Sequence, residues 1–149
     1  MMEKIRKLKD RKGFTLVELI VVLVILAILA ALLIPALTGY IDKANKEKVI
    51  AECRMAVMAV QTQSTTIYGE KGTVTQKALD DVNDATRKLA EVSGHWTAEV
   101  TSAGKVTSLT YENASWHVVY TAATGTAAAQ YSDPDTNVTP LDADTYNVS

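Results

Sequence analysis

The sequence predicts an α+β fold in which one long, kinked N-terminal helix packs against a small antiparallel sheet, with one additional helix. Three patterns lead to this expectation. Nineteen consecutive uncharged and apolar residues, Leu19 to Leu37, have the length of a membrane-spanning helix. Helical spacing of apolar residues continues to about residue 68, and from residue 96 the spacing changes to the period of two that is typical of strands.

A basic segment precedes the apolar run. Residues 1–12 hold six basic against two acidic residues, a balance of +4 in a chain whose formal net charge is −2. Because positive residues remain on the cytoplasmic side of a membrane helix, the chain beyond the helix is expected outside the cytoplasm. Residues 13–149, the chain without this basic segment, have nine basic and fifteen acidic residues, a charge of −6. Nonspecific binding to nucleic acid needs positive charge, so no nucleic acid is predicted as a partner.

Glu18 places a carboxylate at the head of the apolar helix. A charge at bilayer depth costs at least about 2.5–3.5 kcal/mol on insertion scales, so a partner of opposite charge is expected. The natural candidate is a positive group on a neighbouring copy of the chain, which makes self-assembly the leading hypothesis. The alternative is a plain single-span anchor in which the glutamate has no function.

The stretch Gly13-Phe14-Thr15-Leu16-Val17-Glu18, followed by apolar residues up to Pro35, resembles the N-terminus of type IV prepilins and the related pseudopilins. The resemblance covers about residues 7–42. It implies that a prepilin peptidase cuts after Gly13 and N-methylates Phe14. In that family, the glutamate that matches Glu18 pairs with the new N-terminal amine of an adjacent subunit. Opposite charges attract strongly in apolar surroundings, which is consistent with this pairing.

The resemblance also implies three segments: a cytoplasmic leader, residues 1–13, that is removed; a transmembrane or filament-core helix, residues 14–40; and an extracytoplasmic globular domain, residues 41–149, that includes the second half of the long helix. It implies a single-pass membrane protein that becomes part of a cell-surface filament. The filament would be a helical homopolymer of this chain, held by the N-terminal helices. Its assembly would require the prepilin peptidase, a pilus assembly ATPase and an inner-membrane platform protein.

The function that the resemblance implies is that of a pilin, a structural subunit of a type IV pilus used in adhesion, twitching motility, biofilm formation or DNA uptake. The alternative is a pseudopilin of a type II secretion or competence system. A membrane-anchored enzyme or receptor is a third class. The residues offer no cluster of serine, histidine and acid and no phosphate-binding glycine loop, so the chain is not expected to be an enzyme.

The long helix is expected over residues 14–68, with Gly69 as its C-cap and Gly72 completing the turn. Pro35 has no N–H to donate to the preceding turn, which predicts a kink there. Related filament subunits often melt this helix before the proline, helped by a glycine. This chain has Ala27 where that glycine is usual, so a kink is expected rather than local melting.

Two faces are predicted beyond the apolar run. An apolar face, expected to seat the sheet, consists of Ile50, Cys53, Val57, Val60, Ser64 and Ile67. A second face of small and flexible residues, suited to packing on neighbouring helices, consists of Ala51, Met55, Met58 and Thr62. The spacing alone leaves open which face takes which role. A charged set, expected in solvent or at headgroup level, consists of Lys43, Lys46, Glu47, Lys48, Glu52 and Arg54.

Cys53 is the only cysteine, so no intrachain disulfide can form. It is expected to be a small buried residue, with an intermolecular bridge or a reactive thiol as alternatives. In many Gram-negative pilins a disulfide closes the C-terminal region. Its absence here makes the chain resemble a Gram-positive-type pilin or a pseudopilin.

A second amphipathic helix is expected from Thr75 or Gln76 to about Val92, with Thr75 as its N-cap and Gly94 beyond its end. Three strands are expected at about residues 96–100, 105–111 and 116–121, forming an antiparallel meander, with residues 127–131 as a possible fourth.

Residues 132–149 are expected to form a solvated acidic tail; its aspartates are Asp133, Asp135, Asp142 and Asp144. Carboxylates are suitable calcium ligands, but their spacing matches no defined loop, so no cofactor is expected and calcium is the alternative. His95 and His117 lie in predicted strands and are expected to be ordinary polar positions rather than a metal pair.

Overall fold

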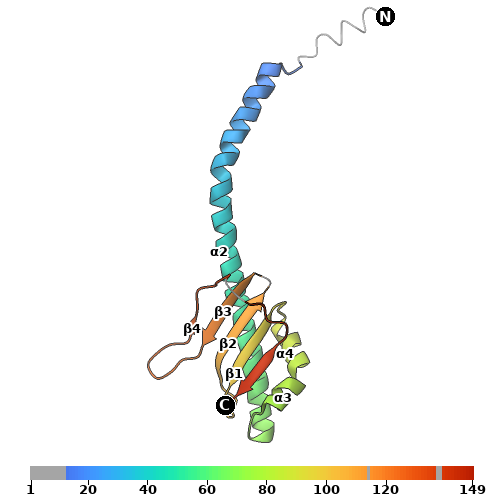
Figure 1. Ribbon diagram of the computed structural model, residues 1–149, viewed down its shortest axis with the longest axis vertical. Coiled ribbons are helices and arrows are strands. Elements are labelled where there is room, and N and C mark those ends of the chain that lie inside the picture. Colours follow the sequence, from blue (N-terminus) through green and yellow to red (C-terminus); the bar gives the residue numbers. More distant parts are fainter. Residues whose placement is uncertain (1–12, 114, 137–138) are drawn as a thin grey trace, which may run out of the picture. The chain divides into compact units, whose positions relative to one another are not determined.

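One helix, α2 (Leu16–Lys71), forms most of the N-terminal half of the chain (Figure 1). The structure is a computed structural model that describes residues 13–113, 115–136 and 139–149. By their internal contacts, the residues form an N-terminal unit that ends at Asp42 and a C-terminal unit, Lys43–Ser149. Residues 1–12 of the predicted leader lie outside the described residues.

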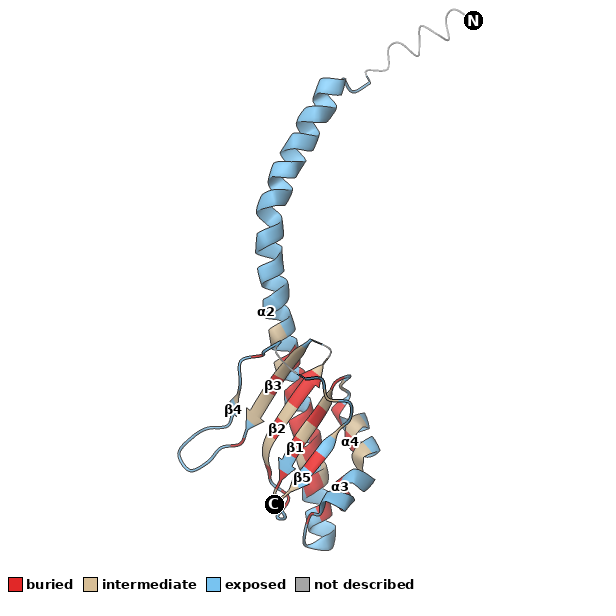
Figure 2. Ribbon diagram, in the orientation of Figure 1, coloured by how far each residue is buried: buried red, intermediate tan, exposed pale blue. Residues whose placement is uncertain are grey.

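The N-terminal unit consists of the apolar half of α2. Its large apolar side chains are all exposed, as the uniform colour of this helix in Figure 2 shows. A helix that is apolar on every side needs lipid or other protein around it. The helix continues through Pro35, and the Thr38 hydroxyl donates a hydrogen bond of 3.0 Å to the Pro35 carbonyl. The kink at Pro35 stays a prediction.

The C-terminal end of α2 lies beyond the position that the sequence predicted. Gly69 is inside the helix, which ends at Lys71. Gly72 has a φ of +73°, and its N–H donates to the Tyr68 carbonyl at 2.8 Å. A helix commonly ends with a glycine in this left-handed conformation. The assignment of Gly69 as the C-cap is therefore wrong, and Gly72 ends the helix.

Two short helices follow where one was predicted: α3 (Gln76–Asp81) and α4 (Asn83–Ala90). Thr75 is the N-cap of α3, because its side chain accepts a hydrogen bond from the Ala78 N–H at 3.3 Å. The helix is interrupted at Val82, which forms a turn between α3 and α4. The next residue, Asn83, accepts a 2.6 Å hydrogen bond from the Tyr146 hydroxyl. This hydrogen bond ties the start of α4 to β5, a contact that local spacing cannot reveal.

The sheet has five strands in the order β4-β3-β2-β1-β5. The predicted antiparallel meander is confirmed as β1 (His95–Val100), β2 (Val106–Asn113) and β3 (Trp116–Thr121), and β4 (Gln130–Tyr131) extends it. A fifth strand, β5 (Thr145–Val148), pairs in parallel with β1. The sheet is therefore mixed rather than purely antiparallel.

The core of the C-terminal unit lies between α2 and the sheet, where buried residues concentrate in Figure 2. The first predicted face of α2 is buried, apart from the half-buried Ile50, and the second face is exposed. The largest fully buried side chains are those of Trp96, Tyr111, Tyr146, Leu79 and Leu109. Because Tyr146 belongs to β5, the prediction of a solvated tail is wrong for this part of residues 132–149.

Candidate assembly site and structural clusters

Thr15 and Glu18 form a reciprocal cap at the start of α2. The Glu18 N–H donates to Thr15 Oγ1 at 3.2 Å, and the Thr15 N–H donates to Glu18 Oε2 at 3.2 Å. The Thr15 hydroxyl donates to the same Oε2 at 3.3 Å. This arrangement, a capping box, satisfies backbone N–H groups that have no partner within the helix. Sequence reasoning gave Glu18 an intermolecular role and missed this local one, although a Thr and a Glu three residues apart signal it.

The capping box leaves one oxygen of the Glu18 carboxylate, Oε1, available for another hydrogen bond or ion pair. The two contacts that reach the carboxylate both use Oε2, and no hydrogen bond to Oε1 occurs within the described residues. Gly13 and Phe14 precede the helix; no atom lies within 4 Å of a Cβ built on Gly13, and Phe14 is 90% exposed. Both residues of the Gly13–Phe14 junction are therefore exposed.

The apolar part of α2 has the length and composition of a membrane span. Its most apolar window has a mean hydropathy of 3.3 and no buried residue, and it is the one such candidate among the described residues. An N-terminal helix of this kind, followed by an α+β C-terminal unit, is the arrangement of a protein with a single N-terminal membrane anchor.

Comparison with known families makes this class more specific. Residues 8–34 match the family model described as the prokaryotic N-terminal methylation motif. The match supports a prepilin of the type IV pilin or pseudopilin kind, a structural protein that is processed by a prepilin peptidase and assembles into a pilus-type polymer. No curated protein and no solved structure matches the chain.

The predicted processing and assembly residues lie within or beside this match. Gly13, Phe14 and Glu18 fall inside residues 8–34, and Pro35 follows directly. The structure brings Glu18 to Thr15, and among the described residues no hydrogen bond joins Glu18 to Phe14. The roles of these residues in cleavage, methylation and polymerisation stay predictions.

A buried ionic cluster holds the C-terminal strand. The Asp144 side chain is 1% exposed and receives hydrogen bonds from Arg87 Nη1 at 2.7 Å to Oδ1 and 2.6 Å to Oδ2. The Trp96 N–H also donates to Oδ1, at 3.3 Å, and His95 Nδ1 lies 3.2 Å from that oxygen. These contacts join β5 to α4 and β1. Asp144 was expected in solvent, because its partners are 48 to 61 residues away.

A second cluster joins α2 to the sheet around Glu52. This side chain was predicted in solvent, but the residue is only 8% exposed, and its Oε2 accepts from the Tyr111 hydroxyl and Asn113 Nδ2, each at 3.0 Å. The Gly94 N–H donates to the same hydroxyl at 3.0 Å. Burial, and also the charge of Glu52, raise the pKa of Tyr111 well above its usual range. Tyr111 therefore stays protonated and donates to Glu52 as a structural contact.

The positions of the potential metal ligands do not favour a metal site in the described part of the chain. Across residues 13–113, 115–136 and 139–149, no group of three or more His, Cys, Asp or Glu side chains could hold a metal ion. His95 and His117 lie on different strands, β1 and β3. Calcium at the C-terminal aspartates stays a prediction, and Asp144 is already bound by Arg87.

Cys53 is fully buried in the core, as predicted. Burial raises the pKa of its thiol from an ordinary 9.0 to about 12, and the nearby Arg54 opposes that shift only in part. Since the thiolate is the reactive form, the position is suited to packing rather than to chemistry.

Proposed function

We propose that the chain, cut after Gly13 and N-methylated at Phe14, polymerises through its N-terminal helix into a type IV pilus-type filament. The observation that carries this proposal is the processing motif on a helix whose apolar surface is exposed on all sides. Lipid covers that surface before assembly, and other copies of the same helix cover it in the filament. Removal of the basic leader leaves the apolar helix intact, so the helix can move from the lipid bilayer into the filament.

In this proposal, Glu18 guides assembly by pairing with the Phe14 amine of a neighbouring copy. Cleavage creates that amine, and N-methylation leaves it protonated at neutral pH. The cap by Thr15 fixes the carboxylate at the helix start while engaging only Oε2. An ion pair in apolar surroundings is strongly favourable when it compensates two charges that are otherwise costly there.

The proposed filament extends from the cell surface and serves adhesion, twitching motility, biofilm formation or DNA uptake. An assembly ATPase and an inner-membrane platform protein drive its growth. A pseudopilin would instead form a short fibre within the envelope, in a secretion or competence system. Fibre length is thus the property that separates the two roles.

The test is microscopy of sheared surface material from cells that produce the full chain, combined with mass spectrometry. We expect long fibres whose main protein begins at N-methylated Phe14. An intact leader in that material would contradict the processing step. Correctly processed protein that never forms fibres beyond the cell would favour the pseudopilin role.

A further inference from the structure

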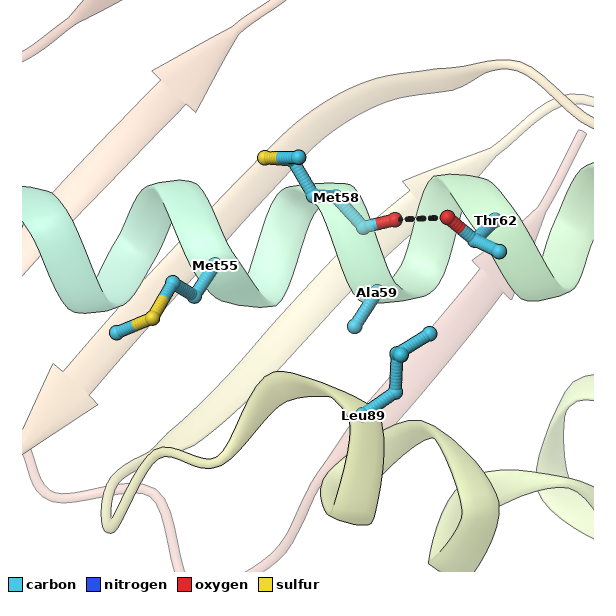
Figure 3. Close-up of a pocket in the computed structure, with 5 residues that line it drawn as sticks. All are labelled: Met55, Met58, Ala59, Thr62 and Leu89. Atoms are coloured by element: carbon cyan, nitrogen blue, oxygen red, sulfur yellow. Dashed lines mark hydrogen bonds between the residues drawn. The ribbon is translucent and has the colours of Figure 1, made fainter.

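The C-terminal unit carries a shallow apolar groove between α2 and α4, with a volume of about 200 Å³. Its lining residues are Met55, Met58, Ala59, Thr62 and Leu89 (Figure 3). Leu89 extends from α4 toward Ala59 on α2. Met58 is 63% exposed and Leu89 52% exposed, although both are large and apolar. The one hydroxyl in the groove, that of Thr62, already donates to the Met58 carbonyl at 2.7 Å.

This groove is suited to receiving an apolar surface. Methionine side chains are flexible and polarisable, so they adapt to the shape of a partner. Neighbouring exposed apolar residues on a small unit commonly mark an interaction surface. With its hydroxyl satisfied, the groove requires no polar group from the partner.

An ordered, protruding loop between β3 and β4 offers such a surface. Thr124 and Ala127 exchange two backbone hydrogen bonds of 3.1 and 2.9 Å, and Gly125 adopts a φ of +55° in the turn between them. The loop is held in shape although it is exposed. Its exposed apolar residues are Ala123, Ala127, Ala128 and Ala129.

The loop and the groove both lie in parts of the C-terminal unit that lack charged residues. Its two longest stretches without Asp, Glu, Lys or Arg are residues 113–132, which contain the loop, and residues 55–69, which contain the α2 side of the groove. Burying a charge without a partner is costly, so an uncharged loop and an uncharged groove are suited to covering each other.

The loop and the groove lie on opposite sides of the unit. The loop leads into β4, at one edge of the sheet, and α4 is joined to β5, at the other edge, through Arg87 and Asp144 (Figure 1). Contact between them is therefore a contact between two copies. Joining different surfaces head to tail produces a ring or an open helical polymer rather than a closed twofold dimer.

We propose that the loop of residues 123–129 of one copy docks into the Met55, Met58 and Leu89 groove of the next copy. This inference rests on the proposed filament function and adds a contact between C-terminal units to the contact between N-terminal helices. The partner is thus a second copy of this chain, held by small apolar side chains against methionine and leucine.

Disulfide trapping in sheared filaments tests the contact. We expect full chains carrying both Met58→Cys and Ala127→Cys to form a ladder of covalent multimers on oxidation. Cys53 is fully buried and should not contribute. Each single variant should give no species larger than a dimer. The matched control combines Met58→Cys with Ala103→Cys, an exposed residue in the β1–β2 turn, and should give no ladder.

A charge in the groove gives an independent measurement. Met58→Glu should reduce fibre yield by about tenfold or more, because every contact along the polymer then buries an unpaired charge. Adding Ala127→Lys should restore much of the yield, and Ala103→Glu alone should have little effect. Normal yield from Met58→Glu, or filaments without a ladder from the Met58–Ala127 pair, would overturn the inference. If the unmodified chain formed no processed fibres, the proposed function itself would fail.

Discussion

Nη1 of Arg87 on α4 donates hydrogen bonds to both carboxylate oxygens of Asp144, at 2.7 and 2.6 Å, across 57 residues of sequence. Asp144 is the residue before β5, so this pair fixes the last strand to the rest of the C-terminal unit. A chain with a single cysteine cannot close this region by an intrachain disulfide. The ion pair provides a noncovalent closure in its place.

Asp144→Ala should lower the free energy of unfolding by about 3–5 kcal/mol, because it leaves a mostly buried guanidinium without its partner. The Trp96 N–H also loses an acceptor. Thermal and denaturant unfolding of the full chain in detergent, followed by circular dichroism, would measure the change. Asp142→Ala, at an exposed position two residues earlier, is the control and should change stability by less than about 0.5 kcal/mol. Equal stability of both variants would contradict the closure role.

The two glycines near the end of α2 should respond in opposite directions to alanine. Gly69→Ala should stabilise the protein by up to about 1 kcal/mol, because the residue is helical and no atom lies within 4 Å of the new Cβ. Gly72→Ala should destabilise it by about 1–2 kcal/mol, since φ at this position is +73°. Denaturant unfolding of both variants measures this contrast. If Gly69→Ala lowered the free energy of unfolding, the result would favour Gly69 rather than Gly72 as the C-cap of α2.

The two functions of Glu18 can be separated by a pair of substitutions. Glu18→Gln keeps a side chain that can complete the capping box but removes the charge, so we expect processed protein that forms few filaments. Thr15→Val removes the cap, at a cost of about 1 kcal/mol of helix stability, but keeps the charge, so filaments should still form. Fibre counts and membrane-bound monomer levels are the measurements. Abundant filaments from Glu18→Gln would exclude an ion pair as the driving contact.

Cys53 should react very slowly with iodoacetamide in the folded protein. With a pKa of about 12 instead of 9.0, its thiolate is about a thousandfold rarer at pH 8, and burial limits access further. The folded state holds this proton more tightly than the unfolded chain does. The contribution of the Cys53 thiol to the free energy of unfolding is therefore fully present below pH 9.0 and is lost as the pH rises toward 12.

Timed alkylation at pH 8 followed by mass spectrometry checks this expectation. A variant carrying Ala128→Cys provides an exposed thiol in the same molecule for comparison. Unfolding should make the two thiols react at similar rates. Comparable rates in the folded protein would instead favour a reactive Cys53.

Several elements could be predicted from the sequence because their signals are local. The apolar run, the basic segment and the Gly13-Phe14 junction with Glu18 indicate an anchored prepilin, and the family match lies on the same residues. Thr75 was identified as a cap from its position before a helical pattern, and its hydrogen bond to Ala78 confirms it. Alternating apolar residues located the three meander strands to within a few positions.

The Gly69 cap and the missed Thr15–Glu18 capping box are local errors. The other errors depend on partners far away in the sequence. β5 has only four residues, which is too few for a clear alternating pattern, and its parallel pairing with β1 requires the whole fold to be in place. Glu52 and Asp144 carry charges that suggested solvent, but hydrogen bonds from Tyr111 and Arg87 compensate their burial.

The sequence by itself predicted the apolar N-terminal helix, the methylation motif that the family model matches and the helix-plus-meander class, because local composition, a short motif and periodicity indicate them. Tertiary structure alone decided how the C-terminal segment is closed and which face of α2 stays exposed. It also placed the apolar loop and the Met55, Met58 and Leu89 groove on opposite sides of the unit. These features arise when packing brings distant residues together, so the linear pattern of residues does not contain them.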